Sequence, residues 1–184
     1  MRHRLNGITV SASSSQEVLS FLVEDPSSDF LASQVQKATG LSKAAVYRAL
    51  DELARKKLVA KHQRGKVVFY SAIGSDVIIR QFKVLKTVEI LKTLVDKLKR
   101  LSYRIVLFGS AARGEDYKDS DIDLLIIAKD LLIVQSVISA FKCKHKIQAV
   151  VKTAPQMEEF EEKEKEFINE INAGIVLWEE GHEH

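Results

Sequence analysis

Two short stretches of this sequence carry residue types that bind phosphate and activate it. A buried strand is predicted over residues 104–108, and it ends at Gly109-Ser110, where a helix is expected to begin. Glycine allows a ligand to approach the backbone closely, and a helix N-terminus offers free N–H groups to phosphate oxygens. The hydroxyl of Ser110 adds one more donor. We therefore expect this turn to hold a phosphate.

The second stretch is Asp121-Ile122-Asp123, at the start of a strand predicted over residues 122–127. Residues two apart on a strand project from the same face, with Cα atoms roughly 6.5–7 Å apart. Two carboxylates beside a phosphate repel each other unless a cation lies between them. Mg²⁺ commonly uses one or two carboxylates together with substrate phosphates, and it stabilises the attacking and leaving oxygens. Either motif alone is typical of an ordinary turn or a solvated strand edge, but their combination favours a functional site.

The order of strand, Gly-Ser, helix and Asp-x-Asp on the next strand resembles the minimal nucleotidyltransferases of the DNA polymerase beta superfamily, over about residues 103–178. The resemblance implies that Gly109 and Ser110 hold a nucleoside triphosphate. It implies that Asp121 and Asp123 are catalytic and bind Mg²⁺ or Mn²⁺. The implied reaction transfers a nucleoside monophosphate, from ATP or another NTP, to a hydroxyl acceptor. Arg113 is expected either to assist with phosphates or to form a surface salt bridge.

One position departs from the pattern of that superfamily. Many members carry a third carboxylate on the following strand, predicted here over residues 147–151, where Gln148 stands at about that position. Glutamine is neither an anionic ligand nor a general base. Catalysis with two acids and a degenerate, nucleotide-sensing domain in a transcriptional regulator both stay open. A third alternative is an antitoxin-like role, in which a helical toxin is the protein acceptor.

Charge divides the chain into two halves. Residues 1–103 carry 18 Lys and Arg against 9 Asp and Glu, whereas residues 104–184 carry 10 against 16. This asymmetry predicts two domains with different partners, and the basic half favours a polyanion such as nucleic acid.

The basic half shows helical spacing from Glu17, again over residues 29–38, and again after Ser42, a good N-cap. Strands are predicted over residues 58–62 and 66–70, on either side of a turn that contains Gly65. Three helices followed by a hairpin predict a winged helix, and residues 15–72 resemble winged helix-turn-helix transcription regulators.

That resemblance implies binding to double-stranded DNA. The helix after the turn would enter the major groove, and the basic hairpin would contact the backbone or the minor groove. The alternative is a winged helix that binds protein. The residues expected to contact DNA are Ser42, Lys43, Tyr47, Arg48, Arg64 and Lys66.

A helix without Pro or Gly is predicted between the two halves, over residues 75–102. Apolar residues recur every seven positions at Val77, Val84, Leu91 and Leu98, which is the spacing of a coiled coil. A homodimer through residues 77–101 and a connecting helix packed against its own domains explain this spacing equally well.

The expected fold is therefore a two-domain α+β/α/β protein. A winged helix occupies residues 1–74, a linker helix residues 75–102, and a nucleotidyltransferase-like mixed sheet with flanking helices residues 103–184. Helices are predicted over residues 131–141 and 155–171, with a short last strand near residues 174–178. The single cysteine, Cys143, and the lack of an apolar run of about 18 residues predict a cytoplasmic protein without a membrane partner.

Overall fold

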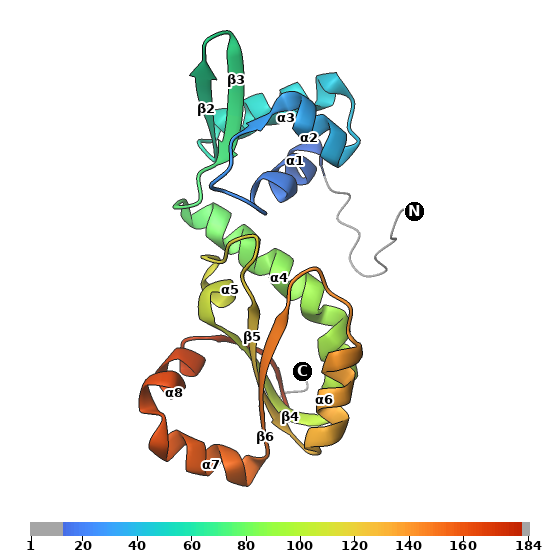
Figure 1. The fold of residues 1–184 in the computed structure, drawn as a ribbon, viewed down its shortest axis with the longest axis vertical. Helices are drawn as coiled ribbons and strands as arrows, with labels where there is room; N and C mark the ends of the chain where they lie inside the picture. The colour runs from blue at the N-terminus through green and yellow to red at the C-terminus, as the bar shows by residue number, and fades with distance from the viewer. Residues whose placement is uncertain (1–12, 182–184) are drawn as a thin grey trace. The chain divides into compact units, whose positions relative to one another are not determined.

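The computed structural model describes residues 13–181 of the chain. The chain divides into two compact units, residues 1–79 (unit 1) and residues 80–184 (unit 2). Figure 1 shows the helices and strands of each unit.

Unit 1 opens with helix α1 (Ser14–Leu22), which starts earlier than the apolar spacing predicts. The cause is a capping box, in which the Ser13 hydroxyl accepts from the Gln16 N–H and the Gln16 side chain accepts from the Ser13 N–H. These two bonds satisfy donors that the first turn would otherwise leave unpaired. The helix therefore begins at Ser14 and not at Glu17.

The predicted start of the helix over residues 29–38 was wrong. Phe30–Leu31 form a short strand, β1, and helix α2 begins only at Ala32 (Ala32–Thr39). β1 pairs with Tyr70 and Phe69 of a later strand, and the Phe30 ring packs edge-on against Phe21 at 4.8 Å between centroids. These long-range contacts outweigh the local helical spacing.

Helix α3 (Lys43–Arg55) completes the helical part of unit 1, and the hairpin of β2 (Val59–Arg64) and β3 (Val67–Ala72) follows. The strands form an antiparallel sheet in the order β1-β3-β2. The core contains fully buried side chains from all three helices: Val18, Leu22, Val35 and Leu50.

Helix α4 (Val77–Leu98) leads into unit 2, whose sheet contains β4 (Ser102–Phe108), β5 (Ile122–Ala128), β6 (Ile147–Lys152) and β7 (Ile175–Glu179). The strand order is β6-β5-β4-β7, with β5 and β6 parallel and the other pairs antiparallel. The expected mixed sheet with flanking helices is thus present.

Helices cover both faces of this sheet (Figure 1). On one face, α4 and α6 (Leu131–Ala140) pack against the side chains of β4 and β5 that point toward them. Leu91, Leu94 and Leu98 of α4 are fully buried there, so the C-terminal part of the predicted coiled-coil seam lies in the core of unit 2. This packing corresponds to the connecting-helix alternative for that part of α4.

The opposite face is covered by α7 (Ala154–Lys163) and α8 (Lys165–Asn172), where one continuous helix was predicted. The helix breaks at Glu164, whose backbone leaves the helical region (φ −116°, ψ 53°). The rings of Phe160 and Phe167 pack edge-to-face with their centroids 5.5 Å apart. The Phe167 ring packs in the same way against Phe108 of β4, with 5.3 Å between centroids. Burial of this aromatic cluster against the sheet explains the break.

Within residues 13–181, none of the helices combines the length and the apolar character that crossing a membrane requires.

The loop that joins the two chemical motifs is fastened to α4. Lys83 is buried, donates to the main-chain carbonyl of Asp116 and lies 3.2 Å from a carboxylate oxygen of the same residue. Arg80 pairs with the neighbouring Glu115 at 3.1 Å. These contacts fix the start of the segment that ends at Asp121.

We expect Lys83→Ala to destabilise the protein by about 3 kcal/mol, because it leaves the half-buried Asp116 carboxylate without its counter-ion. Lys92→Ala, which removes an exposed lysine of the same helix, is the matched control. Urea unfolding of both variants measures the difference, and equal midpoints would show that the buried pair contributes nothing.

Candidate functional site

The turn at Gly109 and the carboxylate of Asp123 lie against each other. β4 ends at Phe108, and helix α5 (Gly109–Arg113) begins with Gly109 at φ +71°. Phe108 is the register partner of Asp123 on β5. A Cβ atom placed on Gly109 would lie 2.5 Å from an Asp123 carboxylate oxygen. The backbone of the turn therefore approaches this carboxylate more closely than any side chain would permit.

Asp123 itself is half-buried, and its carboxylate makes no hydrogen bond or ion pair with any residue that the structure describes. Burial raises the pKa of Asp123, and the negative charges of Asp121 and Glu170 raise that pKa further. Asp123 is thus an acidic group in a place that disfavours its charged form.

Asp121 directly precedes β5, which begins at Ile122, so the Asp-x-Asp motif spans the strand start. One carboxylate oxygen of Asp121 lies 2.9 Å from the ammonium group of Lys146. The Lys146 side chain is 74% exposed, so this ion pair is weak and exchanges readily with another cation.

Ser110 is half-buried, and its hydroxyl makes no hydrogen bond within residues 13–181. Its main-chain carbonyl accepts from Glu115, which closes the turn after α5. The hydroxyl is therefore available to a ligand next to Gly109.

Arg113 ends α5, and its guanidinium group is held by two carboxylates, Glu115 at 3.0 Å and Glu170 at 3.4 Å. Of the two alternatives for Arg113, the structure therefore shows the surface salt bridge. A role with phosphates would require a phosphate to replace one of these carboxylates.

Glu170 of α8 is a part of this site that the sequence did not reveal. It pairs with Arg113, and its charge contributes to the raised pKa of Asp123. The sequence holds no signal for this placement, because Glu170 lies among many acidic residues that have the spacing of a solvated helix face.

Gln148, which the resemblance puts at about the position of a third acid, lies beside Asp123. Gln148 is the register partner of Asp123 on the parallel strand β6. The side of Asp123 that faces β6 therefore offers an amide where many superfamily members have a carboxylate.

The residues present fit a divalent cation held between protein and substrate. An Asp123 carboxylate without a donor, repelled by two neighbouring acids, gains stability when a cation approaches. Among residues 13–181 no cluster of three or more His, Cys, Asp or Glu side chains is arranged to hold a metal ion. Asp121 and Asp123 would thus supply two carboxylates, the number that Mg²⁺ uses when substrate phosphates complete its coordination.

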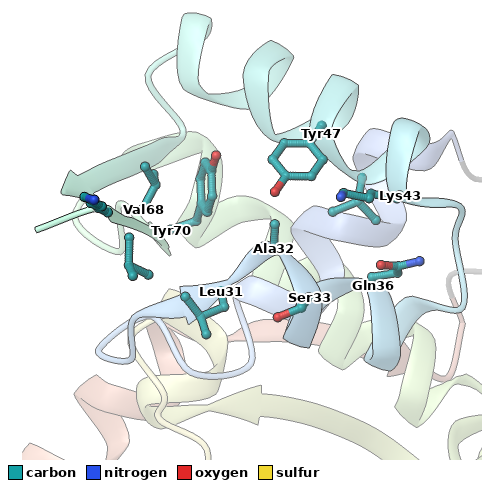
Figure 2. A pocket seen from close by; sticks show the side chains of 11 residues that line it. Leu31, Ala32, Ser33, Gln36, Lys43, Tyr47, Val68 and Tyr70 are labelled. Carbon is teal, nitrogen blue, oxygen red and sulfur yellow. The ribbon is translucent and has the colours of Figure 1, made fainter. Parts of the chain in front are cut away.

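In unit 1 the structure brings together three of the six residues predicted to contact DNA. Lys43, Tyr47 and Lys66 line one groove with a volume of about 460 Å³. Figure 2 shows Lys43 and Tyr47 on one side of this groove and Val68 and Tyr70 of β3 on the other, with Ala32 and Ser33 between them.

The other three residues have different surroundings. Ser42 is the N-cap of α3, and its hydroxyl accepts from the Ala45 N–H at 3.2 Å. Arg64 pairs with Asp29 and lies over the Phe69 ring at 5.1 Å. Arg48 is exposed on α3 and does not line the groove.

Alanine substitutions at two glycines test whether Gly109 is needed for the close approach of Asp123 as well as for its own backbone conformation. Gly109 and Gly40 share φ +71°, but a Cβ atom on Gly40 meets nothing within 4 Å. Gly40→Ala is therefore expected to cost only the left-handed strain, about 1–2 kcal/mol. Gly109→Ala should cost more and abolish nucleotide binding, because Asp123 must move. Denaturant unfolding and calorimetric titration measure both effects, and equal costs would contradict the close approach.

Neutralising Asp123 tests its electrostatic surroundings. A carboxyl group whose pKa is higher in the folded than in the unfolded protein destabilises the fold once it is ionised. The free energy of unfolding therefore falls as the pH rises from the ordinary pKa to the folded pKa, and it stays lower above that range. Without metal, Asp123→Asn should therefore raise the Tm at pH 7 by about 2–4 °C.

The same difference in Tm should vanish below the ordinary pKa of aspartic acid, because both proteins are then neutral at this position. Asp119→Asn, an exposed neighbour without a described partner, should show no such gain. A lower Tm for Asp123→Asn at pH 7 would contradict the proposed repulsion.

The chain has no match among curated proteins. A solved structure of a mutant of Lactococcus lactis ZitR is similar at 17% identity and a TM-score of 0.36, covering 53% of this chain and 68% of that one.

A family model described as "Polymerase beta, Nucleotidyltransferase" matches residues 88–183. This range is more than half of the 184-residue chain. It includes the turn at Gly109 and Ser110, both aspartates and all four strands of the unit 2 sheet. The chain therefore belongs to the polymerase beta nucleotidyltransferase family.

Proposed function

We propose that unit 2 transfers a nucleoside monophosphate from ATP, or another NTP, to a hydroxyl acceptor in a reaction that needs Mg²⁺ or Mn²⁺. The observation that carries this proposal is the contact between the Asp123 carboxylate and the backbone of Gly109. It brings a carboxylate and the turn that starts α5 to one edge of the sheet, where β4 ends and β5 begins.

Each residue of the site has a defined task in this reaction. The N–H groups at the start of α5 and the free hydroxyl of Ser110 hold the triphosphate oxygens. Asp121 and Asp123 would hold the divalent cation, which would supply positive charge next to the phosphate oxygens. The acceptor oxygen bonds to the α-phosphorus, the bond to the β-phosphate breaks, pyrophosphate leaves, and the hydroxyl proton goes to solvent.

The test uses ATP labelled in the α-phosphate, with cell lysate as the source of acceptors. We expect wild-type protein to label an acceptor, and Asp121→Asn/Asp123→Asn to reduce the rate by on the order of 100-fold or more, because several kcal/mol of charge stabilisation are lost. Asp119→Asn removes the same charge two residues before the motif and should retain the activity.

The labelled product also identifies the acceptor class, since nuclease and protease treatment separate a nucleic acid from a protein acceptor. Equal labelling by wild-type protein and the double variant would contradict the proposal.

A second candidate function is a nucleotide sensor within a regulator. Gln148, directly across from Asp123 where a third acid is common, favours this function. A sensor would bind ATP with Mg²⁺ in a way that depends on Asp121 and Asp123, yet label no acceptor. Titration calorimetry beside the transfer assay distinguishes the two functions.

We also propose that unit 1 is a winged helix that binds double-stranded DNA. Three helices followed by a hairpin support this, as do the two lysines and the tyrosine along one groove. Lys43 and Lys66 would contact phosphates, and Tyr47 would face the bases or the sugar edge. Because Arg64 is paired with Asp29, its contribution is expected to be smaller than that of either lysine.

Lys43→Ala should weaken DNA binding about equally for all sequences and lower the slope of log K against log salt by about 1, since one phosphate contact is lost. Fluorescence anisotropy with duplex DNA at several salt concentrations measures this slope. Lys37→Ala, an exposed lysine of α2 that does not line the groove, is the control. A slope unchanged by Lys43→Ala would show that the groove is not part of the DNA interface.

A further inference from the structure

We propose that unit 2 carries a second anion site, a pocket that binds a phosphate group at the end of the sheet away from Asp121 and Asp123. The pocket has a volume of about 650 Å³ and is formed by three segments of unit 2: the turn after α4, the end of β5 and the end of β7. The residues that line it are Lys99, Arg100, Lys129, Trp178, Glu180 and Gly181.

Main-chain hydrogen bonds hold these three segments together. The N–H of Lys129 donates to the carbonyl of Leu101 at 2.9 Å, and the N–H of Glu180 donates to the carbonyl of Tyr103 at 2.8 Å. The backbone of the sheet therefore fixes the positions of the segments whose side chains line the pocket.

Charge identifies the class of ligand. Three cationic side chains and one carboxylate line the pocket, although residues 104–184 as a whole are acidic. Glu180 pairs with Lys129, and Lys99 pairs with Asp96 outside the pocket. Arg100 is exposed and forms no ion pair with the residues that the structure describes. A guanidinium group of this kind, beside two ammonium groups, matches the geometry and charge of a phosphate.

The aromatic part of the wall is consistent with a phosphate ester. Trp178 lines the pocket, and its buried indole N–H has no acceptor among residues 13–181. Tyr103 does not line the pocket, but its ring centre lies 5.1 Å from the ammonium group of Lys129, which does. Aromatic rings next to cations are the combination by which proteins hold nucleotides and single strands.

The pocket is distinct from the site at Gly109. Six residue steps of β4 separate Ser102 from Phe108, which is about 20 Å along the strand. The two sites therefore bind separate molecules, or separate parts of one long molecule. The phosphate has two sources that fit, a free nucleotide or polyphosphate and the backbone of a nucleic acid.

Trp178 is the only tryptophan of the chain, so its fluorescence reports on this pocket alone. The experiment uses the full chain with Asp121→Asn/Asp123→Asn in EDTA, which removes metal-dependent binding at the other site. Pyrophosphate, ATP and a short single-stranded oligonucleotide are titrated separately, and calorimetry checks each affinity.

We expect a saturable change in Trp178 emission. Arg100→Ala/Lys129→Ala should weaken binding by about tenfold or more, because charge-assisted bonds are lost. Glu180→Gln should tighten binding a few-fold, since it removes the carboxylate that competes for Lys129. Lys142→Ala, which removes an exposed lysine outside the pocket, should change nothing.

Saturation by pyrophosphate or ATP would identify a free phosphate ligand, and saturation by the oligonucleotide alone would identify a nucleic-acid backbone. The proposal is overturned if none of the three ligands saturates, or if Arg100→Ala/Lys129→Ala binds as tightly as the parent. Because the parent already lacks both aspartates, either result leaves the proposed transferase reaction to its own test.

Discussion

The chemistry proposed for unit 2 depends on one close approach, that of the Asp123 carboxylate to the backbone at Gly109. Only a residue without a side chain allows it, and only an antiparallel pairing of β4 and β5 in this register brings the two positions together. The contact puts negative charge next to the turn expected to receive a phosphate, which is unfavourable until a cation joins them. The fold thus keeps an arrangement that a cation and a phosphate, the ligands of the proposed reaction, would stabilise.

The surrounding structure holds this arrangement in place. On one face, three leucines of α4 pack under β4 and β5, and on the other, the aromatic cluster of α7 and α8 packs over Phe108. The buried Lys83 fixes the loop between the two motifs. Packing of this kind restricts movement of the turn and of the aspartates, as the proposed alignment of phosphate and metal would require.

Sequence reasoning predicted the parts of the site that depend on local rules. Glycine at a strand end and alternation along a strand were enough to single out Gly109 and Asp123, and the antiparallel pairing of β4 and β5 brings them together. The parallel pairing of β5 and β6 places Gln148 beside Asp123. The same reasoning could not place Glu170, because its position depends on the break at Glu164, after which Phe167 packs against Phe108, far earlier in the sequence. Nor could it show that Arg64 is paired, since its partner Asp29 lies 35 residues away.

The proposed phosphate pocket and the two aspartates lie near opposite ends of β4, about 20 Å apart along the strand. Each end holds charges of both signs: Lys146 pairs with Asp121 at one end, and Glu180 pairs with Lys129 at the other. Exposed charges are screened beyond about 8–10 Å at physiological salt. An anion that reaches unit 2 would therefore experience the charges of one end at a time, and ligands bound at the two ends would affect each other little through electrostatics.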